Sequence, residues 1–469
     1  MTNSDMRKIV IIFALCLFCA SAALAQKAKY VFYFIGDGMG LNPLHTTELY
    51  LASLEGNVGI KHLPFMDFPY STFATSYSAN SDVTDSAAAG TALATGHKTK
   101  NAMLGMNADS VAVNSIAVWA KNSGKKVGVC TNVCIDDATP AAFYAHQVNR
   151  KYYHAIGEQL AASGFHYFAG SDFRKPDENG VELHALCAQN GYTWAYGYQD
   201  AVEKMKTAEK LMMVQRKDCP AHIPYSIDRT SDDLTLGQIV ETGIKMLTKN
   251  NKNGFFLMVE GGAIDHALHG KDARTAIDDI LDFDAAIQVA IDFYKQHPNE
   301  TLIVVTADHD TGGMVPGNGR YMLNLEWLQY QSCSTDVVTA RLNALKKNKM
   351  KKSWDDVKQV LSECYGLFTK VKVNWREEYE LREAYEAAFE GNASEENLYS
   401  KNSALAAKAR DILNRAVGIS WASRSHSGSY VPVFAIGVGA NQFHGRLNNT
   451  DLPLITAKIA GYRLSLIHI

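Results

Sequence analysis

The sequence predicts an α/β fold with a doubly wound, mostly parallel central sheet flanked by helices. Residues 31–35, 255–259 and 302–305 form short apolar runs rich in β-branched and aromatic side chains. Such runs are typical of strands buried on both faces of a parallel sheet. Strand patterns alternate with helix patterns along most of the 469 residues. That alternation is typical of βαβ units and therefore favours a parallel sheet.

Further elements follow from the same patterns. Residues 126–130 predict another strand, and residues 152–163 predict a helix that ends at Gly164, a residue typical of helix C-termini. Residues 272–296 predict a longer amphipathic helix that stops before a proline. Residues 431–438 predict a late strand interrupted by glycine.

The pattern changes between residues 312 and 420. A lysine-rich run at residues 346–352 indicates a solvated helix face, and residues 375–392 are rich in Glu and Arg and predict an exposed helix. We interpret residues 312–420 as a helical and irregular insertion between two sheet strands. We expect one catalytic domain, residues 26–463, that includes this insertion at about residues 312–420.

The N-terminus has the features of a cleavable signal peptide, residues 1–25. Arg7 and Lys8 precede an apolar segment at residues 9–23, and Ala23-Leu24-Ala25 is a typical cleavage site. The alternative is an uncleaved anchor, but the apolar segment is short for a membrane span. We therefore expect a periplasmic or secreted protein without a membrane span after cleavage. Residues 464–469 follow a helix-like end without turn residues, and we interpret them as a tail that need not be native.

Composition excludes some classes of partner. The net charge of -3 favours neither nucleic acid nor a membrane surface, and no nucleic-acid-binding module is apparent. Six cysteines remain beyond the signal segment, and an even number in an exported protein permits disulfides without defining their pairing. Cys130 and Cys134 either form a disulfide or are two buried thiols.

Polar residues follow the three apolar runs directly. Because the carboxyl ends of parallel strands meet at one edge of a sheet, we expect these carboxylates and imidazoles to lie together. Oxygen and imidazole ligands from separate segments predict a site for several metal ions. The residues are Asp37, Glu260, Asp265, His269, Asp308 and His309.

Two further segments have residues suited to phosphate chemistry. Asp85 and Ser86 precede a run of very small residues that predicts a helix, whose N-terminus favours a phosphate; alternatively, Ser86 is only a helix cap. Asp137 and Thr139 can reach a hard cation, and Arg150 can donate two hydrogen bonds to a phosphate. Their alternative interpretation is an Asp-capped helix and a surface arginine.

Four motifs occur in one order: residues 36–40, 84–88, 259–265 and 306–309. Together they resemble the alkaline phosphatase family from residue 30 to about residue 439, least clearly in residues 312–420. The resemblance implies a Ser86 nucleophile that forms a phosphoserine and Arg150 as phosphate clamp. It also implies two Zn²⁺ and one Mg²⁺, phosphate monoester substrates and a homodimer. The implied ligands are Asp265, His269 and His426 for one zinc, Asp37, Asp308, His309 and the Ser86 oxygen for the other, and Asp37, Thr139 and Glu260 for magnesium.

The resemblance places Asp85, Asp137 and His266 around these ligands. The best-known bacterial members have a lysine where this chain has His266, and animal members have a histidine there. Two zinc ions about 4 Å apart can stabilise the attacking and the leaving oxygen of a displacement, which suits phosphoryl transfer. The alternatives are a phosphodiesterase of the same superfamily and a non-catalytic protein that binds phosphate or metal. A sulfatase is disfavoured because Ser86 is followed by three alanines.

Overall fold

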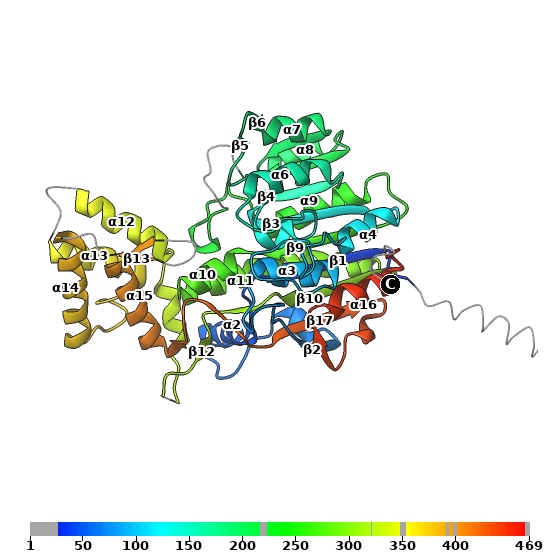
Figure 1. Cartoon of the computed structure of the whole chain (residues 1–469). Helices are drawn as coiled ribbons and strands as arrows, with labels where there is room; N and C mark the ends of the chain where they lie inside the picture. The colour runs from blue at the N-terminus through cyan, green and yellow to red at the C-terminus, as the bar shows by residue number, and fades with distance from the viewer. Residues whose placement is uncertain are drawn as a thin grey trace, which may run out of the picture.

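A ten-stranded sheet forms the centre of the computed structural model (Figure 1). The structure describes residues 27–215, 223–319, 321–347, 353–390, 394–396 and 401–464. The strands in spatial order are β18 (Arg446–Asn448), β2 (Tyr70–Thr75), β17 (Val431–Gly437), β10 (Thr301–Ala307), β1 (Tyr30–Gly36), β9 (Phe255–Gly261), β3 (Lys126–Cys134), β4 (Tyr167–Ser171), β8 (Lys210–Val214) and β7 (Tyr192–Tyr196).

The sheet is mostly parallel, as predicted. Strand β17 runs antiparallel to its neighbours β10 and β2. Every other neighbouring pair in the described sheet is parallel. Strands β1, β9 and β10 at the centre are buried along their whole length, which explains why their sequences are continuously apolar rather than alternating.

Helices cover both faces of the sheet, so the doubly wound prediction is confirmed. On β1, Phe32 and Phe34 pack edge-on against Phe293 and Phe283 of α11, with ring centroids 5.6 and 5.7 Å apart. Tyr33, between them, donates a hydrogen bond to the Leu93 carbonyl of α3, 3.2 Å away. Helices α2 (Leu41–Leu54), α9 (Leu236–Thr248) and α11 (Ala273–Gln296) pack together, and α3 (Ser86–Thr95), α4 (Ile116–Asn122) and α16 (Asp451–Ala460) form a second group.

The elements predicted individually are also present. The helix predicted at residues 152–163 is α6 (Tyr153–Ala162), and Gly164 has the positive φ of 64° that favours glycine. The helix predicted at residues 272–296 is α11, and Asp272 is its N-cap. Helices α7 (Leu183–Gln189) and α8 (Tyr198–Lys204) complete the lobe beside β4, β7 and β8.

A helical region lies between β10 and β17 along the chain. Strands β12 (Met314–Pro316) and β15 (Ile419–Trp421) pair at its base. Its helices gather at one end of the molecule, at the left of Figure 1. They are η3 (Leu325–Tyr330), α12 (Thr335–Lys347), α13 (Trp354–Tyr365), α14 (Trp375–Glu390) and α15 (Ala404–Val417), with the small ribbon β13 (Ser394–Glu396) and β14 (Lys401–Ser403).

Cys130 and Cys134 are two buried thiols and not a disulfide. Both belong to β3, where residues four apart are separated by about 13 Å, too far for a disulfide. The Cys130 thiol instead donates to the Met258 carbonyl at 3.3 Å. The predicted signal peptide, residues 1–25, and residues 465–469 of the predicted tail lie outside the described residues. None of the helices in the described ranges combines the length and hydropathy needed to cross a bilayer.

Candidate active site

Two compact groups of possible metal ligands lie at the carboxyl edge of the central strands. One group is Asp37, Asp308 and His309, and the other is Asp265, His269 and His426. Within each group the ligand atoms lie within 4.8 Å of one another. The structure thus brings together six of the residues that the sequence predicted as metal ligands.

The register of the sheet explains the first group. Gly36, the last residue of β1, pairs with Ala307 of β10. Asp37 and Asp308 are the next residues of these two parallel strands, so they leave the sheet side by side. The His309 Nε2 atom lies 3.3 Å from Asp37 Oδ1 and 3.2 Å from Asp308 Oδ2.

Gly38 makes this close approach possible. Its φ of 68° is unfavourable for other residues, and an added Cβ would lie 2.7 Å from Asp265 Oδ1. Its backbone N–H donates to Asp308 Oδ1 at 3.0 Å. A side chain at this position would therefore push apart the two ligand groups.

The second group combines a helix with a short ribbon. Asp265 and His269 are one turn apart on α10 (Ala263–His269), as residues four apart on a helix must be. His426 comes from β16 (His426–Ser427), which pairs with β11 (Asp310–Thr311) directly after His309. The rings of His309 and His426 stack with centroids 3.6 Å apart. The β11–β16 ribbon therefore holds the two groups next to each other.

The histidine tautomers make this group suited to a cation. His426 Nδ1 lies 2.8 Å from the Thr84 carbonyl, and His269 Nδ1 contacts the Arg424 carbonyl. Because a carbonyl only accepts, both Nδ1 atoms donate, so the Nε2 atom of each ring can bind a metal ion when that ring is neutral. These two Nε2 atoms face each other at 3.1 Å. A proton held between these two atoms or a cation bound beside them makes so close an approach favourable.

The carboxylates lead to the same conclusion. Asp37 Oδ1, Asp265 Oδ2 and Asp308 Oδ2 are buried and have no hydrogen-bond partner among the described residues. Burial, with repulsion from Asp308, Asp265 and Glu260, raises the pKa of Asp37 well above its ordinary value. Burial also raises the pKa of Asp308 to about 7. Burying carboxylate oxygens that have no hydrogen-bond partner costs folding free energy, and bound cations would remove that cost.

Asp265 differs from its neighbours. Burial acts to raise its pKa, but His269 and His426 outweigh burial and hold the pKa of Asp265 well below the ordinary range. Burial lowers the pKa of His309 far below its usual value, so this imidazole is neutral. Neutral imidazole and ionised carboxylate are the forms that bind zinc.

An all-oxygen group adjoins Asp37. The Thr139 hydroxyl donates to Asp37 Oδ2 at 3.4 Å, and it also bonds to Glu260. The Thr131 hydroxyl donates to Glu260 as well. Burial raises the pKa of Glu260 to about 8. Hydroxyl and carboxylate oxygens without imidazole are the ligands that magnesium prefers.

Ser86 begins α3 at the edge of the first group. Asp85, and not Ser86, is the N-cap, since its Oδ1 accepts from the Ala88 backbone N–H at 2.9 Å. The alternative role of Ser86 as a cap is therefore wrong. The Ser86 hydroxyl is buried and lies 3.2 Å from His309 Nε2. The N-terminus of α3 favours negative charge at this position.

Arg150 lies between two carboxylates. Its Nη2 atom donates to Asp137 Oδ1 at 3.0 Å, and its Nη1 atom lies 3.7 Å from Asp85 Oδ2. Asp137 is the N-cap of the short helix α5 (Ala138–Ala141). His266 is buried on α10, and it is one of the positive groups that, after Arg174 and Arg150, outweigh burial and lower the pKa of Asp137. The structure thus places Asp85, Asp137 and His266 around Arg150 and the ligand groups.

Sequence reasoning missed two residues here. Arg174, in the loop after β4, donates from Nη2 to Asp137 Oδ2 at 2.6 Å. The Thr311 hydroxyl donates to Asp265 Oδ1 and lies 3.2 Å from His309 Nδ1. Thr311 is two positions after His309, so the alternation of side chains along an extended chain would place both side chains on the same face. Arg174 is 37 positions from Asp137, and no local pattern joins the two.

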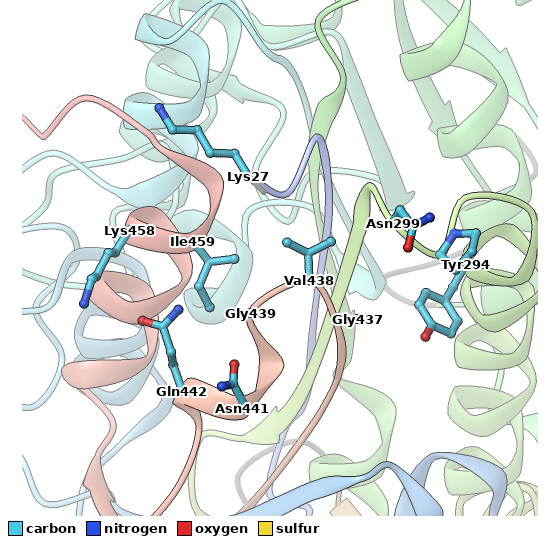
Figure 2. A pocket seen from close by; sticks show the side chains of 11 residues that line it. Lys27, Tyr294, Asn299, Gly437, Val438, Gly439, Asn441, Gln442, Lys458 and Ile459 are labelled. Carbon is cyan, nitrogen blue, oxygen red and sulfur yellow. The ribbon is translucent and has the colours of Figure 1, made fainter. Parts of the chain in front are cut away.

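One cavity lies away from these ligand groups. Figure 2 shows a cavity of about 530 Å³ lined by Lys27, Gly437, Asn441, Gln442 and Lys458, among others. Gly437 pairs with Leu302 near the start of β10. The cavity therefore lies at the amino edge of the parallel strands, opposite the carboxylate groups, and we do not assign it to the active site.

Comparisons with known proteins agree with this geometry. The family model described as alkaline phosphatase matches residues 28–168 and 178–462. Alkaline phosphatase 4 of Bacillus subtilis is 31% identical over 457 residues, covering 94% of this chain and 91% of that protein. The tissue-nonspecific alkaline phosphatase of Gallus gallus is 32% identical, covering 62% and 66% of the two chains.

Solved structures share the fold. The cold-active alkaline phosphatase of Shewanella sp. superposes with a TM-score of 0.78 at 27% identity, covering 92% of this chain and 99% of that chain. The Thermus thermophilus alkaline phosphatase gives a TM-score of 0.79 at 25% identity, with 94% and 93% covered. The chain thus belongs to the alkaline phosphatase family and is a hydrolase of phosphate monoesters, with two residue groups that could hold metal ions.

Proposed function

We propose that hydrolysis proceeds through a phosphoserine on Ser86. The observation that best supports this is the position of the Ser86 hydroxyl, at the N-terminus of α3 and 3.2 Å from His309 of the first ligand group. A serine is a weak nucleophile unless its environment favours the alkoxide. The helix N-terminus and an adjacent cation site provide that environment.

We propose two zinc sites and one magnesium site. Asp37, Asp308, His309 and the Ser86 oxygen would hold one zinc, and Asp265, His269 and His426 the other. Asp37, Thr139 and Glu260 would hold magnesium. When bound, these ions neutralise charge on the phosphate and on the oxygens that attack and leave. The unpartnered carboxylate oxygens and facing Nε2 atoms support this assignment.

Arg150 binds the phosphate in this proposal. A guanidinium can donate two parallel hydrogen bonds, and a monoester dianion presents free oxygens to receive them. A diester has fewer free oxygens, so the fork disfavours a phosphodiesterase. Ser86 distinguishes the proposal from a non-catalytic phosphate-binding protein, since binding alone needs no nucleophile.

The reaction then has two steps. The Ser86 oxygen forms a bond to phosphorus while the bond from phosphorus to the ester oxygen breaks, and the alcohol leaves with a proton in place of the one that Ser86 loses. Water next attacks the same phosphorus, the bond to the Ser86 oxygen breaks, Ser86 regains a proton that the water gives up, and inorganic phosphate is released. Arg150 keeps hold of the phosphoryl oxygens in both steps.

We also propose the organisation of the whole protein. Residues 1–25 are a signal peptide that directs export to the periplasm or beyond the cell. Residues 26–463 form the catalytic domain, and residues 312–420 are an insertion in it. The mature chain acts as a homodimer, which size measurements in solution can test.

The test of the mechanism is to trap the intermediate. Turnover of ³²P-labelled p-nitrophenyl phosphate is quenched in acid, and the labelled peptide is identified by mass spectrometry. We expect the label on Ser86. Ser86→Ala should lose several orders of magnitude in turnover while keeping its metal content, with residual hydrolysis from the rest of the site. Label on another residue, or full activity of Ser86→Ala, would refute the proposal.

A further inference from the structure

Arg174 is a second guanidinium at the phosphate-binding end of the site. It lies in the loop after β4, at the carboxyl edge of the sheet. The family match breaks between residues 168 and 178, and Arg174 lies in that break. The family match therefore does not extend over this residue.

Asp137 is shared between the two arginines. Its Oδ1 accepts from Arg150 Nη2 at 3.0 Å, and its Oδ2 accepts from Arg174 Nη2 at 2.6 Å. The Asp137 side chain is only 7% exposed, so both pairs lie largely out of water. The position of Asp137 therefore depends on both guanidinium groups.

Arg174 is fixed in place by several contacts. Its backbone N–H donates to both carboxylate oxygens of Asp136, at 3.2 and 3.0 Å. Its guanidinium carbon lies 5.5 Å from the ring centre of Tyr153. An arginine held at its backbone, its ring contact and its Nη2 atom is a rigid anchor for Asp137.

The charges around Arg150 show what this anchor does. Arg150 faces two carboxylates, Asp137 at 3.0 Å and Asp85 at 3.7 Å. These three groups alone would carry one net negative charge, which opposes a phosphate dianion and binds Arg150 away from it. Arg174 brings the four groups to neutrality and occupies the second oxygen of Asp137.

We propose that Arg174 is a positioning residue for phosphate binding, which acts through Asp137 to keep Arg150 available to the substrate. The proposal rests on the role of Arg150 in the proposed function. In this proposal, Arg174 does not contact the phosphate. Arg174 therefore changes the affinity for phosphate and not the rate of the chemical step.

The experiment measures binding of inorganic phosphate to the purified, metal-loaded enzyme by calorimetry. We expect Arg174→Gln to weaken phosphate binding about 10-fold, the usual size for a charge-assisted hydrogen bond partly screened by water. KM for p-nitrophenyl phosphate should rise by a similar factor, with a smaller change in kcat. Arg174→Lys, which keeps the charge, should recover part of the loss.

A double-mutant cycle separates positioning from a general charge effect. In an Arg150→Ala background, Arg174→Gln should have little further effect on the dissociation constant, because the residue through which it acts is gone. Equal weakening in both backgrounds, or no weakening in the single variant, would overturn the proposal. Arg341→Gln is the matched control, since Arg341 pairs with Glu363 in the helical region and should leave phosphate binding unchanged.

The test of Arg174 can fail or succeed independently of the test of the Ser86 intermediate. Binding of inorganic phosphate is measured without turnover, so it reports on Arg174 even if the labelled intermediate is found on a residue other than Ser86. Equal unfolding temperatures and metal contents of Arg174→Gln and wild type would exclude a general structural defect as the cause of weaker binding.

Discussion

The metal-ligand edge of the sheet and the helical region between β12 and β15 are built on opposite principles. At the sheet edge, carboxylates and imidazoles are buried beside one another, and three carboxylate oxygen atoms have no hydrogen-bond partner among the described residues. In the helical region, α13 is an ordinary amphipathic helix with a capping box at Ser353 and Asp356 and a glycine at its C-terminus, Gly366. Burying like charges together at the sheet edge costs folding free energy that the rest of the fold must offset. The apolar packing of the helical region contributes folding free energy.

The helix at each region shows the same contrast. All ten residues of α3 are buried, and most are Ala, Thr or Gly, so α3 can pack closely and deliver Ser86. Helix α13 buries only one face, which includes Trp354, Val357 and Leu361. The helix that presents the proposed nucleophile is buried on all sides, whereas a packing helix needs only an apolar stripe.

Metal removal should affect the two regions differently. Treatment with EDTA should abolish activity, and zinc with magnesium should restore it. Because the carboxylates after β1 and β10 would lose their counter-charges, the sheet edge should also become less stable. Hydrogen exchange should show lost protection around Asp37 and Asp308 but unchanged protection in α13. Full activity of a verified metal-free sample would contradict the metal assignment.

A core substitution in the helical region should lower the stability of that region and leave activity unchanged. Leu361 is fully buried on α13, so Leu361→Ala should lower the free energy of unfolding of that region by about 2–5 kcal/mol. Turnover per folded molecule should stay close to wild type. Denaturant unfolding followed by p-nitrophenyl phosphate assays measures both. A large fall in kcat at unchanged folding would mean that the two regions are coupled.

Hydrogen bonds at Asp272 connect the helical region to the sheet edge. Asp272 caps α11 just after the His269 turn and accepts from Thr335 and Gln331 of the helical region, at 2.7–2.8 Å. Repair of a Leu361→Ala defect by metal saturation would point to this junction.

What the sequence revealed also differs between regions. The strands and several candidate ligands were predictable because Asp37, Glu260 and Asp308 closely follow apolar runs, and parallel strands end at a common edge. His426 follows no such run and was expected only from the family resemblance. The phosphate-binding end was less predictable. Asp85 was expected beside the nucleophile, but its role as the cap that frees Ser86 appears only in three dimensions. The contact of Arg174 with Asp137 joins two loops, and no periodicity encodes it.

A charge change at the sheet edge should produce a moderate effect. His266 is buried on α10 and is one of the groups that lower the pKa of Asp137. His266→Lys would place a permanent point charge there, which can hold product phosphate through water. We expect a several-fold lower phosphate inhibition constant and slower turnover where product release limits the rate. Kinetics with added phosphate between neutral and alkaline pH measure both, and unchanged values would show that residue 266 has no kinetic role.

The smallest expected effect lies outside both regions, in the lobe of α6–α8. His184 Nε2 lies 2.8 Å from Asp172 Oδ2, and Nδ1 contacts Glu182. The hydrogen bond to Asp172 is the largest of the effects that raise the pKa of His184 to about 9. Since an unfolded histidine has a pKa of about 6.5, this pair stabilises the fold fully below pH 6.5. That contribution is lost as the pH rises through about 9.

His184→Gln should therefore lower stability below pH 6.5 and approach wild type above about pH 9. The side chains are partly exposed, so screening limits the difference to about 1 kcal/mol or less. Denaturant unfolding across this pH range measures the difference. A constant difference at all pH values would mean that His184 stabilises the lobe by packing against Trp194, with ring centroids 4.6 Å apart, and not by its charge.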